Sequence, residues 1–144
     1  MTSTEERRYR LRLAQGFLEE ARQDLGLRRW RSCVDNSQLA VENAAKAVLA
    51  VLGPVGRTHS PGALLQRAVE ERRFPEAARA SVEKLAECAR LLGPSVHVES
   101  DYGDDTTWRT PWEIFGQTDA EQAIRVAEEA LGLASQLIPQ GGQA

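Results

Sequence analysis

Apolar residues recur at steps of three and four along most of the chain, which is the spacing of a helix with one buried face. In the first stretch, from about Glu5 to Leu25, the repeat consists of Leu11, Ala14, Leu18, Ala21 and Leu25. Ser3 and Glu6 have the spacing of a capping box at its start. A second stretch, from about residue 29 to residue 52, places on one face Val34, Ser37, Val41, Ala44, Ala45, Val48 and Leu52. Because the break between the two is short, we expect an antiparallel hairpin.

The same spacing, together with capping residues, predicts further helices. Ser60 and Pro61 suit the N-cap and first position of a third helix that ends near residue 71. Pro75 opens a fourth, whose apolar face would hold Ala78, Val82, Leu85, Ala89 and Leu92. A capping-box pair, Thr118 and Glu121, opens the final helix, whose apolar face would hold Ala120, Ile124, Ala127, Leu131, Ala134 and Ile138.

The segment 95–117 has no helical period and is rich in acidic and aromatic residues. Long loops in compact domains are usually functional or disordered. We expect this one to be ordered, anchored to the bundle by Trp108, Trp112, Ile114 and Phe115. Residues 139–144 predict a flexible tail. The sequence thus predicts a single all-α domain over residues 1–144, an up-and-down helical bundle of four to five helices.

The composition excludes some classes of protein but does not indicate a particular function. The 144 residues are 42% hydrophobic and carry a formal net charge of −3, which gives no general drive toward nucleic acid or an anionic membrane. There is no secretory signal and no run long enough to span a membrane, so we predict a cytoplasmic protein. Cys33 and Cys88 each fall within a helical pattern, which favours buried free thiols over a disulfide or a metal pair.

Polar residues repeat every four positions within the second helix, where Gln38, Glu42 and Lys46 form one ridge. The ridge has two interpretations: a solvated helix face, or one wall of a groove or dimer face shared with the third helix. His59, just before the third helix, can bond the neighbouring backbone or take part in binding. The residues alone leave these alternatives open.

The order of these features resembles the HEPN domain, a helical domain linked to nucleotide and RNA biology. The resemblance covers about residues 11–137 and begins at FLEEARQDLGLRRWRSCVDNSQLAVENAAKAVLAVLG, whose ridge matches the family's Gln-x-x-x-Glu-x-x-x-Lys pattern. THSPGALL resembles the start of the family's third helix. SDYGDD resembles its Arg-Tyr-Pro-Asp stretch through Tyr102 and Asp104, although Asp101 and Gly103 depart from the Arg and Pro found there.

The resemblance implies a dimeric module that binds a nucleotide or substrate and is paired with a separate minimal nucleotidyltransferase, in an arrangement similar to toxin–antitoxin systems. The binding residues that it implies are Gln38, Glu42, Lys46, His59 and Asp104. We expect the dimer surface on the first and second helices. We expect no cofactor and no metal, because the acidic residues at 99–105 fit no EF-hand spacing and the histidines and cysteines have no metal-ligand spacing.

A second function, a metal-independent ribonuclease toxin, stays open. Ribonucleases of the HEPN family use an Arg-x(4–6)-His motif, in which a 2′-OH attacks the adjacent phosphate, His accepts the proton and Arg stabilises the developing charge. Arg90 and His97 have six residues between them, and Tyr102 is a third candidate catalytic residue. Leu91 stands where active members usually carry a polar residue, and a Gly-Pro pair breaks the helix between Arg90 and His97. These departures favour the binding module.

Overall fold

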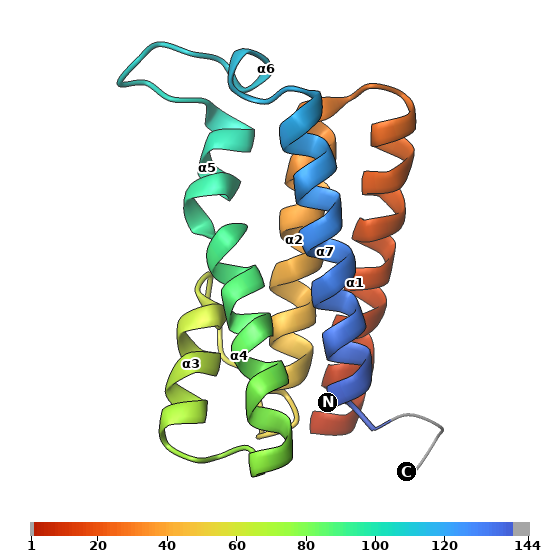
Figure 1. Cartoon of the computed structure of the whole chain (residues 1–144), viewed down its shortest axis with the longest axis vertical. Helices are drawn as coiled ribbons and strands as arrows, with labels where there is room; N and C mark the ends of the chain where they lie inside the picture. The colour runs from red at the N-terminus through yellow and green to blue at the C-terminus, as the bar shows by residue number, and fades with distance from the viewer. Residues whose placement is uncertain (1, 140–144) are drawn as a thin grey trace.

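The structure is a computed structural model and describes residues 2–139. Within that range the chain forms seven helices and no strand: α1 Ser3–Gly26, α2 Trp30–Leu49, α3 Pro61–Glu70, α4 Glu76–Leu91, α5 Pro94–Tyr102, α6 Pro111–Ile114 and α7 Gln117–Leu137. The long helices α1, α2, α4 and α7 run side by side, with α3 beside α4 and α5 continuing beyond the end of α4 (Figure 1). The prediction of an all-α helical bundle is confirmed.

Helix α2 lies at the centre of the bundle. It packs most extensively against α1 and α7 and also contacts α3, α4 and α5. Val34, Val41 and Val48 of α2 are at most 2% exposed, and Leu65 of α3 and Leu85 of α4 are fully buried. Burying one such side chain is worth about 1.5–3 kcal/mol. The apolar faces predicted for separate helices therefore meet in one core.

Both predicted capping boxes are wrong in register. At α1 the box joins Thr2 and Glu5, one residue earlier than predicted: Glu5 N donates to Thr2 Oγ1 at 3.1 Å, and Thr2 N donates to Glu5 Oε2 at 3.0 Å. At α7 the Asp119 carboxylate accepts a hydrogen bond from Gly116 N at 2.9 Å, two residues earlier than the predicted pair. Near the start of each helix, several pairs of polar residues three positions apart could form the capping box. The sequence pattern therefore predicts that a helix forms there but does not identify its first residue.

The prediction of a loop over 95–117 is wrong in two places, because α5 and the single turn α6 lie there. Pro94 opens α5, and Gly103 ends it with a φ of +75°. The spacing of apolar residues does not predict α5, because the one buried residue of this helix is the polar Ser100. The turn between α5 and α6 is closed by backbone groups of Asp104 and Arg109, which exchange hydrogen bonds of 2.9 and 3.0 Å.

Two of the four expected anchors of this segment are largely exposed. Trp108 is 85% exposed and Trp112 is 72% exposed, whereas Phe115 packs against the core as predicted. The loop is held by backbone hydrogen bonds and by contacts of α5 and α6 with α2. Trp108, which is almost fully exposed, therefore contributes little to the bundle's own stability.

The remaining expectations concern the thiols, the membrane and the tail. Cys33 and Cys88 are buried and free, as predicted, and burial raises the pKa of each thiol to about 11. No helix in the described part of the chain is long and apolar enough to cross a membrane. The predicted tail, apart from residue 139, lies outside the described residues.

Candidate functional site

A stripe of polar side chains runs along one face of α2. We call it the α2 polar stripe, and its members are Arg31, Asp35, Gln38, Glu42 and Lys46, at steps of four, three, four and four residues. Residues at these steps lie above one another on a helix. Gln38 is 1% exposed and Lys46 is 8% exposed, so the predicted ridge is not a solvated helix face.

The last three residues of the stripe are joined by hydrogen bonds. Gln38 Nε2 donates to Glu42 Oε1 at 3.4 Å, and Lys46 Nζ donates to Glu42 Oε2 at 3.1 Å. Gln38 Oε1 is buried and has no hydrogen-bond partner among residues 2–139. Turning the amide round would set its oxygen against the Glu42 carboxylate, so Glu42 determines its orientation. Glu42 thus holds both of its neighbours in place.

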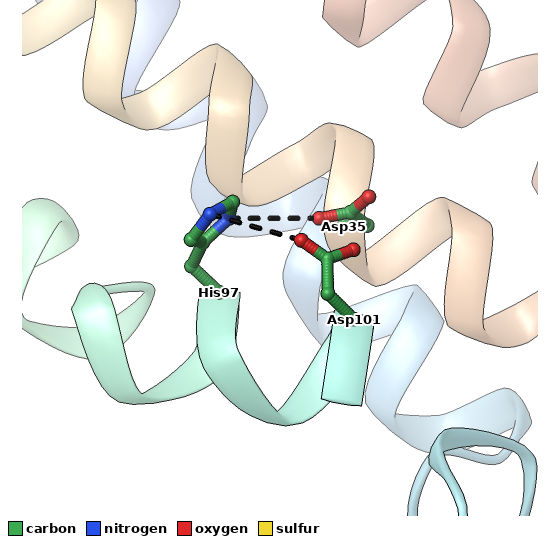
Figure 2. A group of neighbouring side chains, drawn as sticks. All are labelled: Asp35, His97 and Asp101. Atoms are coloured by element: carbon green, nitrogen blue, oxygen red, sulfur yellow. Dashed lines mark ion pairs between the residues drawn. The ribbon is translucent and has the colours of Figure 1, made fainter. Parts of the chain in front are cut away.

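At the N-terminal end of the stripe, Asp35 faces two residues of α5. Figure 2 shows the His97 ring directed toward Asp35 and Asp101. His97 Nδ1 lies 3.8 Å from Asp35 Oδ1, and His97 Nε2 lies 3.7 Å from Asp101 Oδ2. Both separations exceed hydrogen-bond length, so the three groups are gathered without being bonded to one another. The His97 side chain is 37% exposed, so this end opens to solvent.

Ser100 and Arg31 fasten α5 to this end of α2. The buried hydroxyl of Ser100 lies 3.0 Å from Asp35 Oδ1 and 3.0 Å from the carbonyl oxygen of His97, either of which can accept its proton. Arg31 Nη1 donates to the carbonyl oxygen of Ser100 at 2.8 Å and lies 3.6 Å from Asp101 Oδ1. These contacts fix the positions of the side chains around His97.

Fixed negative charge exceeds fixed positive charge at this end. Burial raises the pKa of Asp35, and the neighbouring carboxylate of Asp101 raises it further. The hydrogen bond from Ser100 and the positive charges of Arg31 and of protonated His97 lower it, but they do not cancel the effect of burial. The cluster of Asp35, His97 and Asp101 can hold a cation, or its carboxylates can orient the imidazole.

At the C-terminal end of the stripe, Lys46 lines a small cavity. We call this cavity of about 280 Å³ the basic pocket, and its lining residues are Arg10, Lys46, Val55, Gly56, Arg57, Thr58 and His59. Arg10 pairs with Glu6 at 3.4 Å, as Lys46 pairs with Glu42 at 3.1 Å. No ion pair within residues 2–139 involves Arg57, which is exposed. The pocket thus carries one unpaired cation together with the imidazole of His59.

The structure brings together only some of the predicted site residues. Lys46 and His59 share the basic pocket. Arg90 pairs with Glu87 and lines a separate cavity between α3 and α4. No hydrogen bond or ion pair joins Arg90 to His97 in the part of the chain that the structure describes.

Two further candidates lie near the end of α5. Tyr102 is 81% exposed at its last residue. Asp104 accepts a hydrogen bond from Thr106 N at 2.9 Å, which lowers the pKa of its carboxyl group. Asp104 thus shapes the turn after α5, and it does not line the basic pocket.

Four residues at the N-terminal end of the α2 polar stripe were not among the predicted site residues: Arg31, Asp35, Ser100 and Asp101. Extending the ridge backward by three and four positions would have included Asp35 and Arg31. No comparable signal links these two to α5, which lies more than sixty residues further along the chain. Trp112 belongs to the same region, since its ring centroid lies 5.7 Å from the Arg31 guanidinium.

Comparison with known proteins places this geometry in a family. The profile of the HEPN domain family matches residues 8–137. A solved structure, described as the crystal structure of TT1696 from Thermus thermophilus, is similar over 92% of this chain and 98% of that one, with a TM-score of 0.66 and 22% sequence identity. No curated protein sequence matches the chain. The chain belongs to the HEPN domain family.

Proposed function

We propose that this HEPN-family chain is a homodimeric module that binds the phosphate group of a nucleotide, or of a nucleotide-bearing substrate, in the basic pocket. The observation that carries the proposal is the meeting of Lys46 and His59 with Arg10 and Arg57 around one cavity. The proposed partner is a minimal nucleotidyltransferase.

The size and charge of the basic pocket suit a phosphate with its sugar. A volume of about 280 Å³ is near the lower limit of ligand pockets, which span roughly 300–1,000 Å³. Arg57 is exposed and supplies a cation that no carboxylate neutralises in residues 2–139. Charge-assisted hydrogen bonds from such a group to phosphate are stronger than those between neutral groups.

Calorimetric titration with AMP and ATP tests the pocket. Arg57→Ala and His59→Ala remove exposed side chains, so both variants should fold normally. We expect Arg57→Ala to weaken binding by about tenfold, the loss of one charged hydrogen bond. Arg8→Ala removes an exposed arginine from α1 outside the pocket and should leave the affinity unchanged. Absence of binding, or equal affinity in all four proteins, would overturn the proposal.

The proposed dimer surface is the outer face of α1. The prediction also included the second helix, but α2 is enclosed by its neighbours, which leaves α1 alone. A shallow hollow there is lined by Tyr9, Arg12, Leu13, Gly16, Phe17 and Glu20. Gly16 has nothing within 4 Å of the position of a Cβ, so a second helix can approach closely. An antiparallel copy centred on Gly16 would place Arg12 opposite Glu20 twice, as two-fold symmetry requires.

Charge exchange tests this dimer. Arg12→Glu and Glu20→Arg each bring like charges together across the proposed interface, so each should shift light-scattering mass toward the monomer. The double variant restores opposite charges and should recover the dimer. A monomeric wild type at micromolar concentration, or single variants that remain fully dimeric, would contradict this arrangement.

The minimal nucleotidyltransferase partner is proposed from the family resemblance. Coexpression of the two proteins, with an affinity tag on the nucleotidyltransferase, should recover this chain in a complex of defined stoichiometry. Failure of the two to copurify at low salt would overturn this part of the proposal alone.

One observation favours the second candidate function, a metal-independent ribonuclease. The partly exposed imidazole of His97 is flanked by carboxylates that can orient it as a general base. Cleavage of RNA by the wild type in EDTA, abolished in both His97→Ala and Arg90→Ala and reduced in Tyr102→Phe, would support it. The present pairing of Arg90 with Glu87 opposes it, and cleavage that survives both alanine variants would remove it.

A further inference from the structure

We propose that Asp35, His97 and Asp101 bind a divalent transition-metal ion, of which Zn²⁺ is the best match. These residues supply one imidazole nitrogen and two carboxylate oxygens, a donor set that zinc accepts while leaving a fourth position for water or substrate. The inference is independent of the basic pocket, which lies at the other end of the α2 polar stripe.

The geometry of the three groups fits one ion. One ligand atom from each residue lies within 4.8 Å of the others. The 3.8 Å separation joins Asp35 to His97 Nδ1 and the 3.7 Å separation joins Asp101 to His97 Nε2, so an ion bound through one of these nitrogens lies farther from one of the two carboxylates. Ligand atoms on a tetrahedral zinc with bonds of about 2.0–2.2 Å are separated by about 3.4 Å. Closing the cluster around an ion held by one nitrogen of His97 therefore needs side-chain movements of about an ångström, which the partly exposed His97 and the exposed Asp101 can make.

A second observation concerns the His97 ring. Its Nδ1 atom is shielded from solvent and lacks a hydrogen-bond partner anywhere in residues 2–139. The nearest carboxylate oxygen, on Asp35, is 3.8 Å away, which is too long for a hydrogen bond. A buried nitrogen left in this state costs free energy, which a bound ion would recover.

The supporting contacts are those that metal sites use. The Ser100 hydroxyl lies 3.0 Å from Asp35 Oδ1, and Arg31 holds the backbone of Ser100 at 2.8 Å. Hydrogen bonds of this kind orient the ligands of a metal and tune its affinity. Arg31 also lies 3.6 Å from Asp101, where its positive charge opposes a cation. The site should therefore bind its ion less tightly than one without the arginine.

Titration of the purified, tag-free chain with ZnCl₂, together with the visible spectrum of the Co²⁺ form, tests the site. We expect one ion per chain and a cobalt spectrum of a nitrogen- and oxygen-ligated site. His97→Ala and Asp101→Asn should each weaken binding by about tenfold or more. Circular dichroism shows whether each variant keeps its fold.

Asp105→Asn is the matched control, since Asp105 is an exposed carboxylate that follows α5 closely in the sequence and is not part of the cluster. It should bind zinc as the wild type does. Zinc that binds His97→Ala and the wild type equally is adventitious and would overturn the proposal, as would the absence of binding at millimolar zinc. Nucleotide affinity, measured on the same samples, reports on the basic pocket separately.

Discussion

The two ends of the α2 polar stripe satisfy their charges in different ways. At the C-terminal end, Glu42 and Lys46 lie four apart on the same helix and form a 3.1 Å pair whose side chains are 13% and 10% exposed. At the N-terminal end, Asp35 depends on Ser100 and His97 of another helix, and its distance to His97 is 3.8 Å. One end is therefore completed locally and the other by tertiary packing.

The ends also differ in the sign of the charge they leave over. Lys46 is neutralised by Glu42, but the exposed Arg57 beside it adds positive charge to the basic pocket. At the other end, the two carboxylates of Asp35 and Asp101 face the single positive charge of Arg31, so negative charge is in excess. A single helix thus carries the proposed anion site at one end and the proposed cation site at the other.

Removing the charge of Lys46 should produce the largest effect on stability. Lys46→Met keeps the length of the side chain but leaves Glu42 without its cation in a largely buried position. We expect the free energy of unfolding to fall by about 3 kcal/mol, the usual cost of breaking a buried pair from one side. Urea denaturation at fixed protein concentration measures it.

The double variant Glu42→Gln with Lys46→Met sharpens this result. Because no uncompensated charge remains, the double variant should be more stable than Lys46→Met alone. A loss below about 1 kcal/mol in Lys46→Met would mean that water reaches Glu42, and that the pair behaves as an exposed one.

Gly103→Ala should have the next largest effect on stability. Of the two ends of the α2 polar stripe, it should disturb only the N-terminal one. Gly103 ends α5 with a φ of +75°, and an added Cβ would clash with the carbonyl oxygen of Arg109. We expect a loss of about 2 kcal/mol, consistent with strain at a left-handed residue. Zinc affinity should fall because α5 carries His97 and Asp101, while nucleotide affinity should not change.

Gly132→Ala provides the matched control for this substitution. Gly132 lies inside α7 without a positive φ, and an added Cβ there would have nothing within 4 Å. Alanine should stabilise the helix by about 0.5–1 kcal/mol. If both glycine variants behaved alike, the turn after α5 would not be the element that positions the N-terminal end.

The sequence predicts features that depend on local spacing better than features that depend on tertiary packing, and the two ends of the stripe differ in this respect. The bundle was predictable because apolar residues such as Leu11, Ala14 and Leu18 repeat with helical spacing and are buried. Helix α5 was not, since a helix whose buried residue is the polar Ser100 carries no apolar period. Short helices that pack through polar groups lack the signal on which such predictions depend.

The same holds for the candidate sites. The Glu42–Lys46 pair was predictable because it is a local spacing of four residues. The sequence and its family resemblance named Lys46 and His59, but not their shared cavity, which depends on the path of residues 55–59. Asp35 lies near His97 only because α5 packs against α2, so no spacing of residues in the sequence predicts this contact.

Asp35→Asn should have the smallest effect on the protein alone. Asparagine keeps the shape of aspartate and an oxygen that can accept the Ser100 hydrogen bond, and it removes a carboxylate that repels Asp101. We expect the free energy of unfolding to change by about 0.5 kcal/mol or less, in contrast to Lys46→Met. Thermal unfolding without metal measures this change.

Zinc should separate Asp35→Asn from the wild type. A ligand that binds only the folded state raises its stability in proportion to the logarithm of its concentration over the dissociation constant. The wild type should therefore gain thermal stability with increasing zinc, and Asp35→Asn should gain less, because a neutral amide is a poorer ligand than a carboxylate. A large loss of stability in metal-free Asp35→Asn would show instead that the ionised carboxylate serves the fold, and that the two ends of the stripe are alike.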